Sequence, residues 1–191
     1  IASAQGGYFT AAQALRSGYA YSQQHYDVER GNWLRVDRGV FRLHDYPSTE
    51  REDLIRWSLW SRDRQGTPQA VVSHETALTV HEMSDIMPAR VHLTVPPGFR
   101  KRIPPGCVLH KARLVRGDTE ARTGYLVTTP RRTLLDVAES ALSQEHLDAA
   151  VHDAVERGLI RRRLLEDASC SPRARHRLDR ALSAMPVEEP A

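Results

Sequence analysis

The sequence lacks any apolar run near the roughly 18 residues that a membrane-spanning helix needs. Its first residues, IASAQGG, lack the basic and apolar regions of an export signal and do not begin with Met, so we expect a trimmed rather than an exported chain. Cysteine is scarce: Cys107 and Cys170 lie far apart and form no C-x-x-C pair, which predicts two free thiols. We therefore expect a cytoplasmic protein that does not span a membrane.

The motifs of several enzyme classes are also missing. There is no G-x-S-x-G elbow and no glycine-rich phosphate loop. Of the 27 basic residues only Lys101 and Lys111 are lysines, and neither has an acid two residues before it, as a nuclease strand would. His74-Glu75 and His81-Glu82 stand seven apart, but neither pair completes H-E-x-x-H. The sequence therefore predicts no enzyme, no metal site and no cofactor.

What is present is an ordinary globular composition with an uneven distribution of charge. The chain has 191 residues, enough for one large domain or two small ones, with 40% hydrophobic and 27% charged residues. Residues 91–133 contain nine Lys or Arg against two acids, a net +7, whereas residues 134–191 sum to −3. Concentrated positive charge favours an anionic partner.

Two short helices are predicted near the N-terminus. Thr10 and Gln13 have the spacing of a capping box, which predicts a helix over about residues 11–17. Ser22 is a good N-cap for a second helix, which Gly31 would close. Its periodicity predicts an inward stripe and an outward polar face. The inward stripe is Tyr21, His25 and Val28, and the outward face is Gln23, Gln24, Asp27 and Arg30.

A hairpin follows the second helix directly. Residues 33–36 and 40–43 are extended runs separated by a turn at Asp37-Arg38-Gly39. Trp33 and Phe41 are expected to form the core of this hairpin. Helix, turn, helix and hairpin in this order are typical of a winged helix-turn-helix, whose first helix should precede residue 8, so that only its end, Ala2 to Gln5, is present.

In such a domain the second helix enters the major groove of double-stranded DNA and the hairpin holds the backbone. Glutamine can pair with adenine, and arginine with guanine or phosphate. The predicted base contacts are Gln23, Gln24 and Arg30, and the predicted phosphate contacts are Asn32, Arg35, Arg38 and Arg42. The alternatives are a solvated helix face and a hairpin whose charges keep it soluble.

The domain boundary is predicted at residues 46/47, because Pro47 disfavours helix before it and Thr49 opens a new capping box. Residues 47–191 are expected to form a second domain with a small sheet and several helices. Strands are predicted at 91–95, 107–111 and 125–128, and helices at about 49–62, 74–83, 129–142, 144–157, 161–167 and 172–184, with a frayed tail at 187–191. The predicted fold class is α+β, a winged helix-turn-helix followed by a mixed α/β domain.

A second basic cluster lies on or beside these strands. Its members are Arg100, Lys101, Arg102, Lys111, Arg113 and Arg116. It could extend a nucleic-acid footprint or bind an acidic protein, and the alternative is a charged, solvated loop.

An ordered set of short runs resembles the AbiEi antitoxins of bacterial type IV toxin-antitoxin systems. The resemblance covers about residues 6–160. The runs that carry it are GYFTAAQA (7–14), YAYSQ (19–23), GNWLR (31–35), RGVFRL (38–43), VSHETAL (72–78), RVHLTVP (90–96) and VTTPRRTLLD (127–136). One departure is His81-Glu82, where such proteins often have a His-Gly pair.

The resemblance implies a cytoplasmic, non-enzymatic antitoxin. Its N-terminal domain would repress its own operon at inverted repeats, and its C-terminal domain would neutralise a nucleotidyltransferase toxin. The second basic cluster is then the candidate contact surface for that toxin or for its nucleic-acid substrate. The resemblance adds Ser22 to the DNA-binding positions. Two other interpretations stay open: a stand-alone winged-helix transcription regulator, and a nuclease-like enzyme targeted by a winged helix.

Overall fold

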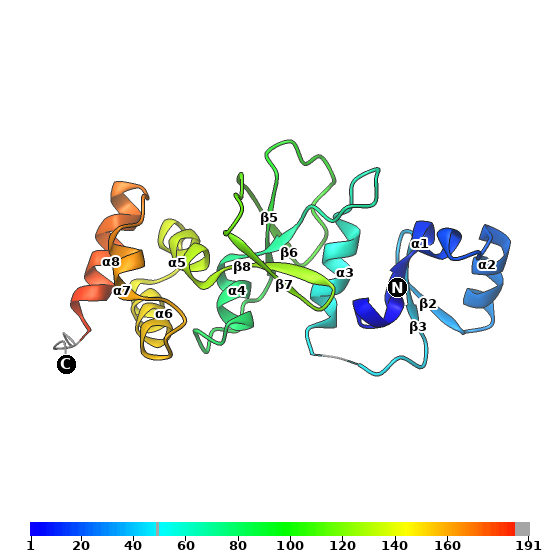
Figure 1. The fold of residues 1–191 in the computed structure, drawn as a ribbon, viewed down its shortest axis with the longest axis horizontal. Coiled ribbons are helices and arrows are strands. Elements are labelled where there is room, and N and C mark those ends of the chain that lie inside the picture. Colours follow the sequence, from blue (N-terminus) through cyan, green and yellow to red (C-terminus); the bar gives the residue numbers. More distant parts are fainter. Residues whose placement is uncertain (49, 186–191) are drawn as a thin grey trace. The chain divides into compact units, whose positions relative to one another are not determined.

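The computed structural model describes residues 1–48 and 50–185. Thr49 and the predicted tail at 187–191 lie outside the described residues. In chain order the elements are η1 (Ala2–Gln5), β1 (Tyr8–Thr10), α1 (Ala11–Arg16), α2 (Tyr21–Glu29), β2 (Trp33–Asp37), β3 (Val40–Leu43), α3 (Glu52–Trp60), β4 (Val71–Val72), α4 (His74–Val80), β5 (Val91–Val95), β6 (Cys107–Lys111), β7 (Thr119–Arg122), β8 (Tyr125–Thr128), α5 (Pro130–Glu139), α6 (Gln144–Glu156), α7 (Arg162–Glu166) and α8 (Pro172–Ser183) (Figure 1). The fold is α+β, as predicted.

The chain forms two compact units. The first, here the winged unit, comprises residues 1–71 with 98–101 and 121–126. The second unit comprises residues 72–97, 102–120 and 127–191. No helix among the described residues has the length and apolar character needed to cross a bilayer.

The winged unit contains the two helices and the hairpin that the sequence predicted, but the N-cap of α2 is Ala20 rather than Ser22, and it makes no side-chain cap bond. Thr10 and Gln13 form the capping box: the backbone N–H of Gln13 donates to Thr10 Oγ1 at 3.1 Å, and the backbone N–H of Thr10 donates to Gln13 Oε1 at 2.8 Å. β3 pairs antiparallel with both β1 and β2, so the sheet order is β1-β3-β2. The sequence analysis missed β1, because three residues that are all buried show no alternation to detect. This element order and sheet are those of a winged helix-turn-helix.

Aromatic rings form the core behind α1 and α2. Phe9, Trp33 and Phe41 are buried together, with ring centroids 4.7 Å apart for Phe9 and Trp33 and 5.7 Å for Trp33 and Phe41. Each such pair contributes about 0.5–1.5 kcal/mol beyond the area that it buries. Trp33 and Phe41 therefore pack in the core of the wing, as predicted.

α3 packs on the other part of this sheet. Ile55 and Leu59 are buried in one cluster with Tyr8 and Val40. The compact units therefore divide the chain after Val71, whereas the sequence predicted a boundary after Tyr46. Independent folding of residues 47–191 stays a prediction.

The second sheet has the order β6-β5-β4-β8-β7. β5 and β6 are parallel, and β4 pairs parallel with β8 through Val72 and Val127. β4 and β7 were not predicted, since two or four residues carry too little periodicity. α4 ends at Val80 rather than at Met83, where the sequence had placed its end.

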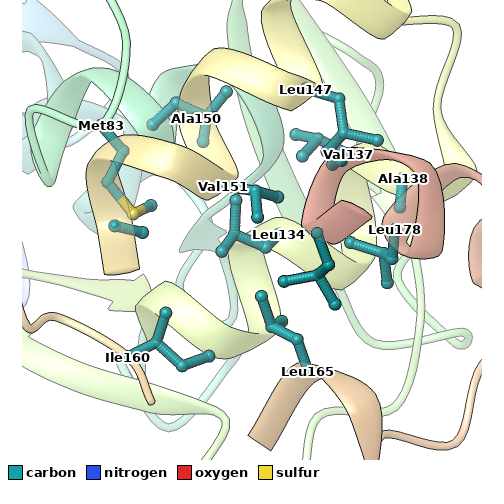
Figure 2. Packing of buried hydrophobic residues seen from close by; sticks show 14 of the residues in the cluster. Met83, Leu134, Val137, Ala138, Leu147, Ala150, Val151, Ile160, Leu165 and Leu178 are labelled. Carbon is teal, nitrogen blue, oxygen red and sulfur yellow. The ribbon is translucent and has the colours of Figure 1, made fainter. Parts of the chain in front are cut away.

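The helices of the second unit bury an aliphatic core. α5 begins as predicted, with Thr129 as N-cap and Pro130 in the first turn. One face each of α5, α6 and α8 converges on this core (Figure 2). Its fully buried members include Leu134, Val137, Leu147, Val151, Leu165 and Leu178.

Candidate nucleic-acid interface

The exposed face of α2 differs from the predicted one. Tyr21 is 66% exposed and His25 is exposed, so the predicted inward stripe at Tyr21, His25 and Val28 is wrong for its first two members. The buried side of α2 contains Gln24 and Asp27, with Val28 half-buried. The outward face is therefore built from Ser22, Tyr26 and Arg30 on one stripe and from Tyr21, His25 and Glu29 on the next.

Gln24 is buried for a reason that hydrophobic periodicity does not detect. It is 3% exposed, and its Nε2 donates to the carbonyls of Ala11 at 3.2 Å and Tyr19 at 2.9 Å. Buried carbonyls need hydrogen-bond donors, and the Gln24 side chain supplies them, so it stabilises the turn between α1 and α2. In this conformation Gln24 does not present its amide to a base, contrary to the expectation from sequence.

Arg42 is likewise turned inward. It is 8% exposed, its guanidinium donates to the Tyr46 carbonyl at 2.8 Å and pairs with Glu52 at 3.2 Å, and it lies over the Tyr8 ring. The alternation of β3 places residue 42 between Phe41 and Leu43 but does not reveal that α3 covers this face. Arg42 therefore braces β3 against the start of α3 and does not present a charge to phosphate.

The other predicted contacts are exposed. Arg35 and Arg38 lie on the wing, where the strand register shifts between Arg35 and Asp37. Arg38 occupies the turn, with its backbone N–H donating to Asp37 Oδ1 at 2.6 Å and its carbonyl accepting from Arg62 at 3.3 Å. Gly39 has φ 65°, which a turn of this kind requires.

Asp27 connects the helix face to the start of the wing. Its Oδ2 accepts from Gln23 Nε2 at 3.1 Å and its Oδ1 accepts from Asn32 Nδ2 at 3.0 Å. The carboxylate is buried, whereas Gln23 and Asn32 are exposed. The sequence analysis placed Asp27 on the outward face and missed this role, although the i, i+4 spacing of Gln23 and Asp27 is a signal for such a pair.

The second basic cluster is divided between the units. Arg100 and Lys101 belong to the winged unit, whereas Arg102, Lys111, Arg113 and Arg116 belong to the second unit. All six are exposed. Lys101 donates to the Trp60 carbonyl at 2.6 Å, and partial burial, with repulsion from Arg62, lowers the pKa of Lys101.

Three histidines form an unpredicted group in the second unit. The rings of His74 and His110 stack 3.5 Å apart, and His110 Nε2 lies 3.2 Å from His92 Nδ1. His92 Nδ1 lies 2.6 Å from a carboxylate oxygen of Glu75. β5 and β6 are paired in parallel, with His92 opposite Val108 and Thr94 opposite His110, so the two histidines lie on neighbouring strands, two positions apart in register. His81 lies elsewhere in this unit, with Nε2 2.7 Å from the Thr128 carbonyl.

Burial controls the titration of this group. It lowers the pKa of His74 to about 3, with a further contribution from the His110 charge. It also lowers the pKa of His110. Burial would raise the pKa of Glu75, but the hydrogen bond from His92 and the nearby charges hold it at about 2. Among the described residues, no three His, Cys, Asp or Glu side chains are arranged to hold a metal ion. Neither Cys107 nor Cys170 forms a disulfide, as predicted.

The comparisons with known proteins concern both the fold and the family. Among solved structures, this chain matches the crystal structure of RV2827C protein from Mycobacterium tuberculosis. The sequence identity is 15%, the alignment covers 95% of this chain and 78% of that chain, and the TM-score is 0.45. No curated protein matches the sequence. The family model described as the AbiEi antitoxin C-terminal domain matches residues 70–183, more than half of the chain. The chain therefore belongs to the AbiEi antitoxin family.

Proposed function

We propose that this chain is a cytoplasmic DNA-binding antitoxin of a type IV system. The winged unit would bind inverted repeats in its own operator and repress the operon, and the AbiEi domain would neutralise a nucleotidyltransferase toxin. The observation that carries the proposal is that one chain joins a sheet ordered β1-β3-β2, with the helix pair α1 and α2, to the matched domain. The proposal assigns no reaction to the chain.

In this proposal α2 lies in the major groove. Ser22, Gln23 and Arg30 are exposed on α2 and present a hydroxyl, an amide and a guanidinium, the groups that read base edges and phosphates. Tyr21 and Tyr26 on the same helix offer apolar contact to thymine methyl groups. Gln24 and Arg42 are left out of the contact set because both are buried.

The wing would hold the phosphate backbone. Arg35 and Arg38 are exposed, and each phosphate neutralised by such a side chain releases a counterion. Asn32 precedes the wing and is exposed beside Gln23, so it is placed to fix the register of α2 on the duplex.

Operator binding is tested with the full chain and a labelled duplex from upstream of its own gene. We expect binding to this duplex at least tenfold tighter than to a scrambled duplex of equal composition. Arg30→Ala with Arg35→Ala should weaken binding to both duplexes, whereas Arg64→Ala, an exposed arginine in the loop after α3, should leave both unchanged. Equal affinity of the wild-type chain for the two duplexes would contradict the operator assignment.

Toxin neutralisation is tested by co-expression with the neighbouring toxin gene. The wild-type chain should restore growth, and the Arg30→Ala and Arg35→Ala variant should restore it equally, because those residues lie outside the AbiEi domain. Loss of protection in that variant would show that the two functions do not separate between the units.

The basic cluster is a candidate contact surface for the toxin or its nucleic-acid substrate. We propose testing its members as two sets, the consecutive residues 100–102, which span both units, and Lys111, Arg113 and Arg116, which all lie in the second unit. Neutralising Lys111, Arg113 and Arg116 together is expected to reduce protection at an unchanged melting temperature. Neutralising Arg161, Arg163 and Arg180, three exposed arginines of the second unit, is the charge-matched control. Full protection by the triple variant would identify Lys111, Arg113 and Arg116 as a solvated surface and direct the search to Arg100, Lys101 and Arg102.

A further inference from the structure

We infer that Asp27 is a positioning residue that sets the base preference of the winged unit; the inference rests on the proposed DNA-binding function. Asp27 is 7% exposed, yet both of its carboxylate oxygens bond to side chains that reach solvent. One is Gln23 on α2, and the other is Asn32 before β2. A buried charge thus fixes two exposed amides at the face assigned to DNA.

A primary amide alone is an ambiguous reader of bases. Its oxygen accepts and its nitrogen donates, and rotation by half a turn exchanges the two. A carboxylate can only accept, so it engages the NH₂ side of each amide. The hydrogen bonds of 3.1 Å from Gln23 and 3.0 Å from Asn32 therefore turn the side-chain nitrogen of each amide toward Asp27. The amide oxygens, Oε1 of Gln23 and Oδ1 of Asn32, then lie on the opposite side. Asp27 removes the ambiguity before DNA arrives.

This orientation favours one purine. Gln23 keeps one N–H after bonding to Asp27, together with its Oε1 acceptor. Adenine offers an N6–H donor and an N7 acceptor to the major groove, which match that pair. Guanine offers two acceptors, N7 and O6, and would need both N–H groups of the amide. We therefore expect Gln23 to select adenine over guanine while Asp27 holds it.

The charge of Asp27 is otherwise unfavourable at this surface. A carboxylate near DNA repels phosphates, so removing it should strengthen non-specific binding. Glu29 on the same helix provides the comparison: it pairs with His25 at 3.2 Å and stays largely exposed. The two acids carry the same charge on one helix, but the contacts to exposed amides belong to Asp27.

The test uses the full chain and a duplex that the wild-type protein selects from a random pool. Dissociation constants are measured for that duplex, for versions with each adenine replaced by guanine, and for an unselected duplex. Asp27→Ala should reduce the largest adenine-over-guanine preference about tenfold, the scale of one good base contact. Glu29→Ala should strengthen binding to every duplex and leave the preference unchanged.

Gln23→Ala and Asp27→Asn test the same inference independently. Gln23→Ala should abolish the same preference, and adding Asp27→Ala to it should cause no further loss, because the two act as one unit. Asp27→Asn keeps one acceptor oxygen and should retain part of the preference, which covers the case in which Asp27→Ala fails to fold. An unchanged preference in a folded Asp27→Ala chain would overturn the inference. Failure of the wild-type chain to select any duplex would instead overturn the DNA-binding proposal, before any variant is made.

Discussion

The two units bury polar side chains in different ways. In the winged unit Gln24, Asp27 and Arg42 are buried, and each bonds to a backbone carbonyl, an acid or an exposed amide. In the second unit the buried polar residues include His74, which lies against the partly buried His110 and Glu75, and the pKa values of these three groups are lowered. The buried polar side chains of the winged unit therefore hold groups in place at its surface. Those of the second unit include titratable groups, so acid should destabilise that unit.

The distribution of tryptophan makes this comparison measurable. Trp33, Trp57 and Trp60 are the three tryptophans of the chain, and all belong to the winged unit. Intrinsic fluorescence therefore reports on that unit alone. Helical circular dichroism is weighted toward the second unit, which contains α4 to α8.

The largest expected effect breaks the second unit alone. Leu134 is fully buried in the aliphatic core of α5, α6 and α8, so Leu134→Ala should cost about 3 kcal/mol of unfolding free energy. Thermal melting followed by circular dichroism should shift to lower temperature, and toxin protection should fall with it. The tryptophan transition and operator binding should persist, and their simultaneous loss would show that the units unfold as one.

The reciprocal change breaks the winged unit. Gly7 has φ 85°, and a Cβ there would lie 2.5 Å from Cγ of the Tyr46 ring. Gly7→Ala should therefore cost about 2 kcal/mol, from the left-handed backbone and the steric clash together. Gly18→Ala is the matched control, since φ is 92° with nothing within 4 Å of the added Cβ, and it should cost about 1 kcal/mol. Equal costs for the two variants would exclude the clash with Tyr46.

The same contrast explains what could be predicted from sequence. The capping box at Thr10 and the wing turn at Gly39 depend on neighbours within a few residues, and the burial of Trp33 and Phe41 follows the alternation of the hairpin; all were predicted. The burial of Gln24 and Arg42 depends on carbonyls and on α3, which local periodicity does not contain.

The unpredicted parts of the second unit have a similar cause. His74, His92 and His110 lie on α4, β5 and β6 and meet through strand pairing. His81 stands seven residues after His74 in the sequence, but in the structure the ring that stacks on His74 is that of His110. The domain boundary was placed at Pro47 because capping signals restart there, but Ile55 and Leu59 contribute to a cluster with Tyr8 and Val40.

Acid should lower the stability of the second unit more than that of the winged unit. His74 has a folded pKa of about 3 against an unfolded value near 6.5, so below pH 6.5 the unfolded chain binds a proton that the folded chain does not. The contribution of neutral His74 to the free energy of unfolding is therefore fully present above pH 6.5. It decreases as the pH falls toward 3, by about 1.4 kcal/mol per pH unit at most. Glu75, with a pKa of about 2, adds a loss between about pH 4.5 and 2.

Urea unfolding between pH 7.5 and 5 measures this effect. The circular dichroism midpoint should fall with pH more steeply than the tryptophan midpoint. His74→Asn should flatten the dependence, because asparagine does not titrate and tolerates the positive φ of 52° at this position. An unchanged slope in that variant would assign the acid sensitivity to other groups.

The smallest expected effect concerns the surface that the winged unit shapes. Arg38 is exposed at the wing turn, and the contacts that hold it there come from its backbone. Arg38→Ala should therefore leave stability within about 0.5 kcal/mol of wild type. If its guanidinium meets a phosphate, the slope of log affinity against log salt should decrease by about 0.9, equally for selected and unselected duplexes. Gln23→Ala should show the opposite pattern. It should lower the base preference and leave the salt slope unchanged, because an uncharged amide releases no counterion. An Arg38→Ala slope equal to that of wild type would place Arg38 away from the DNA backbone and leave Arg35 as the phosphate contact of the wing.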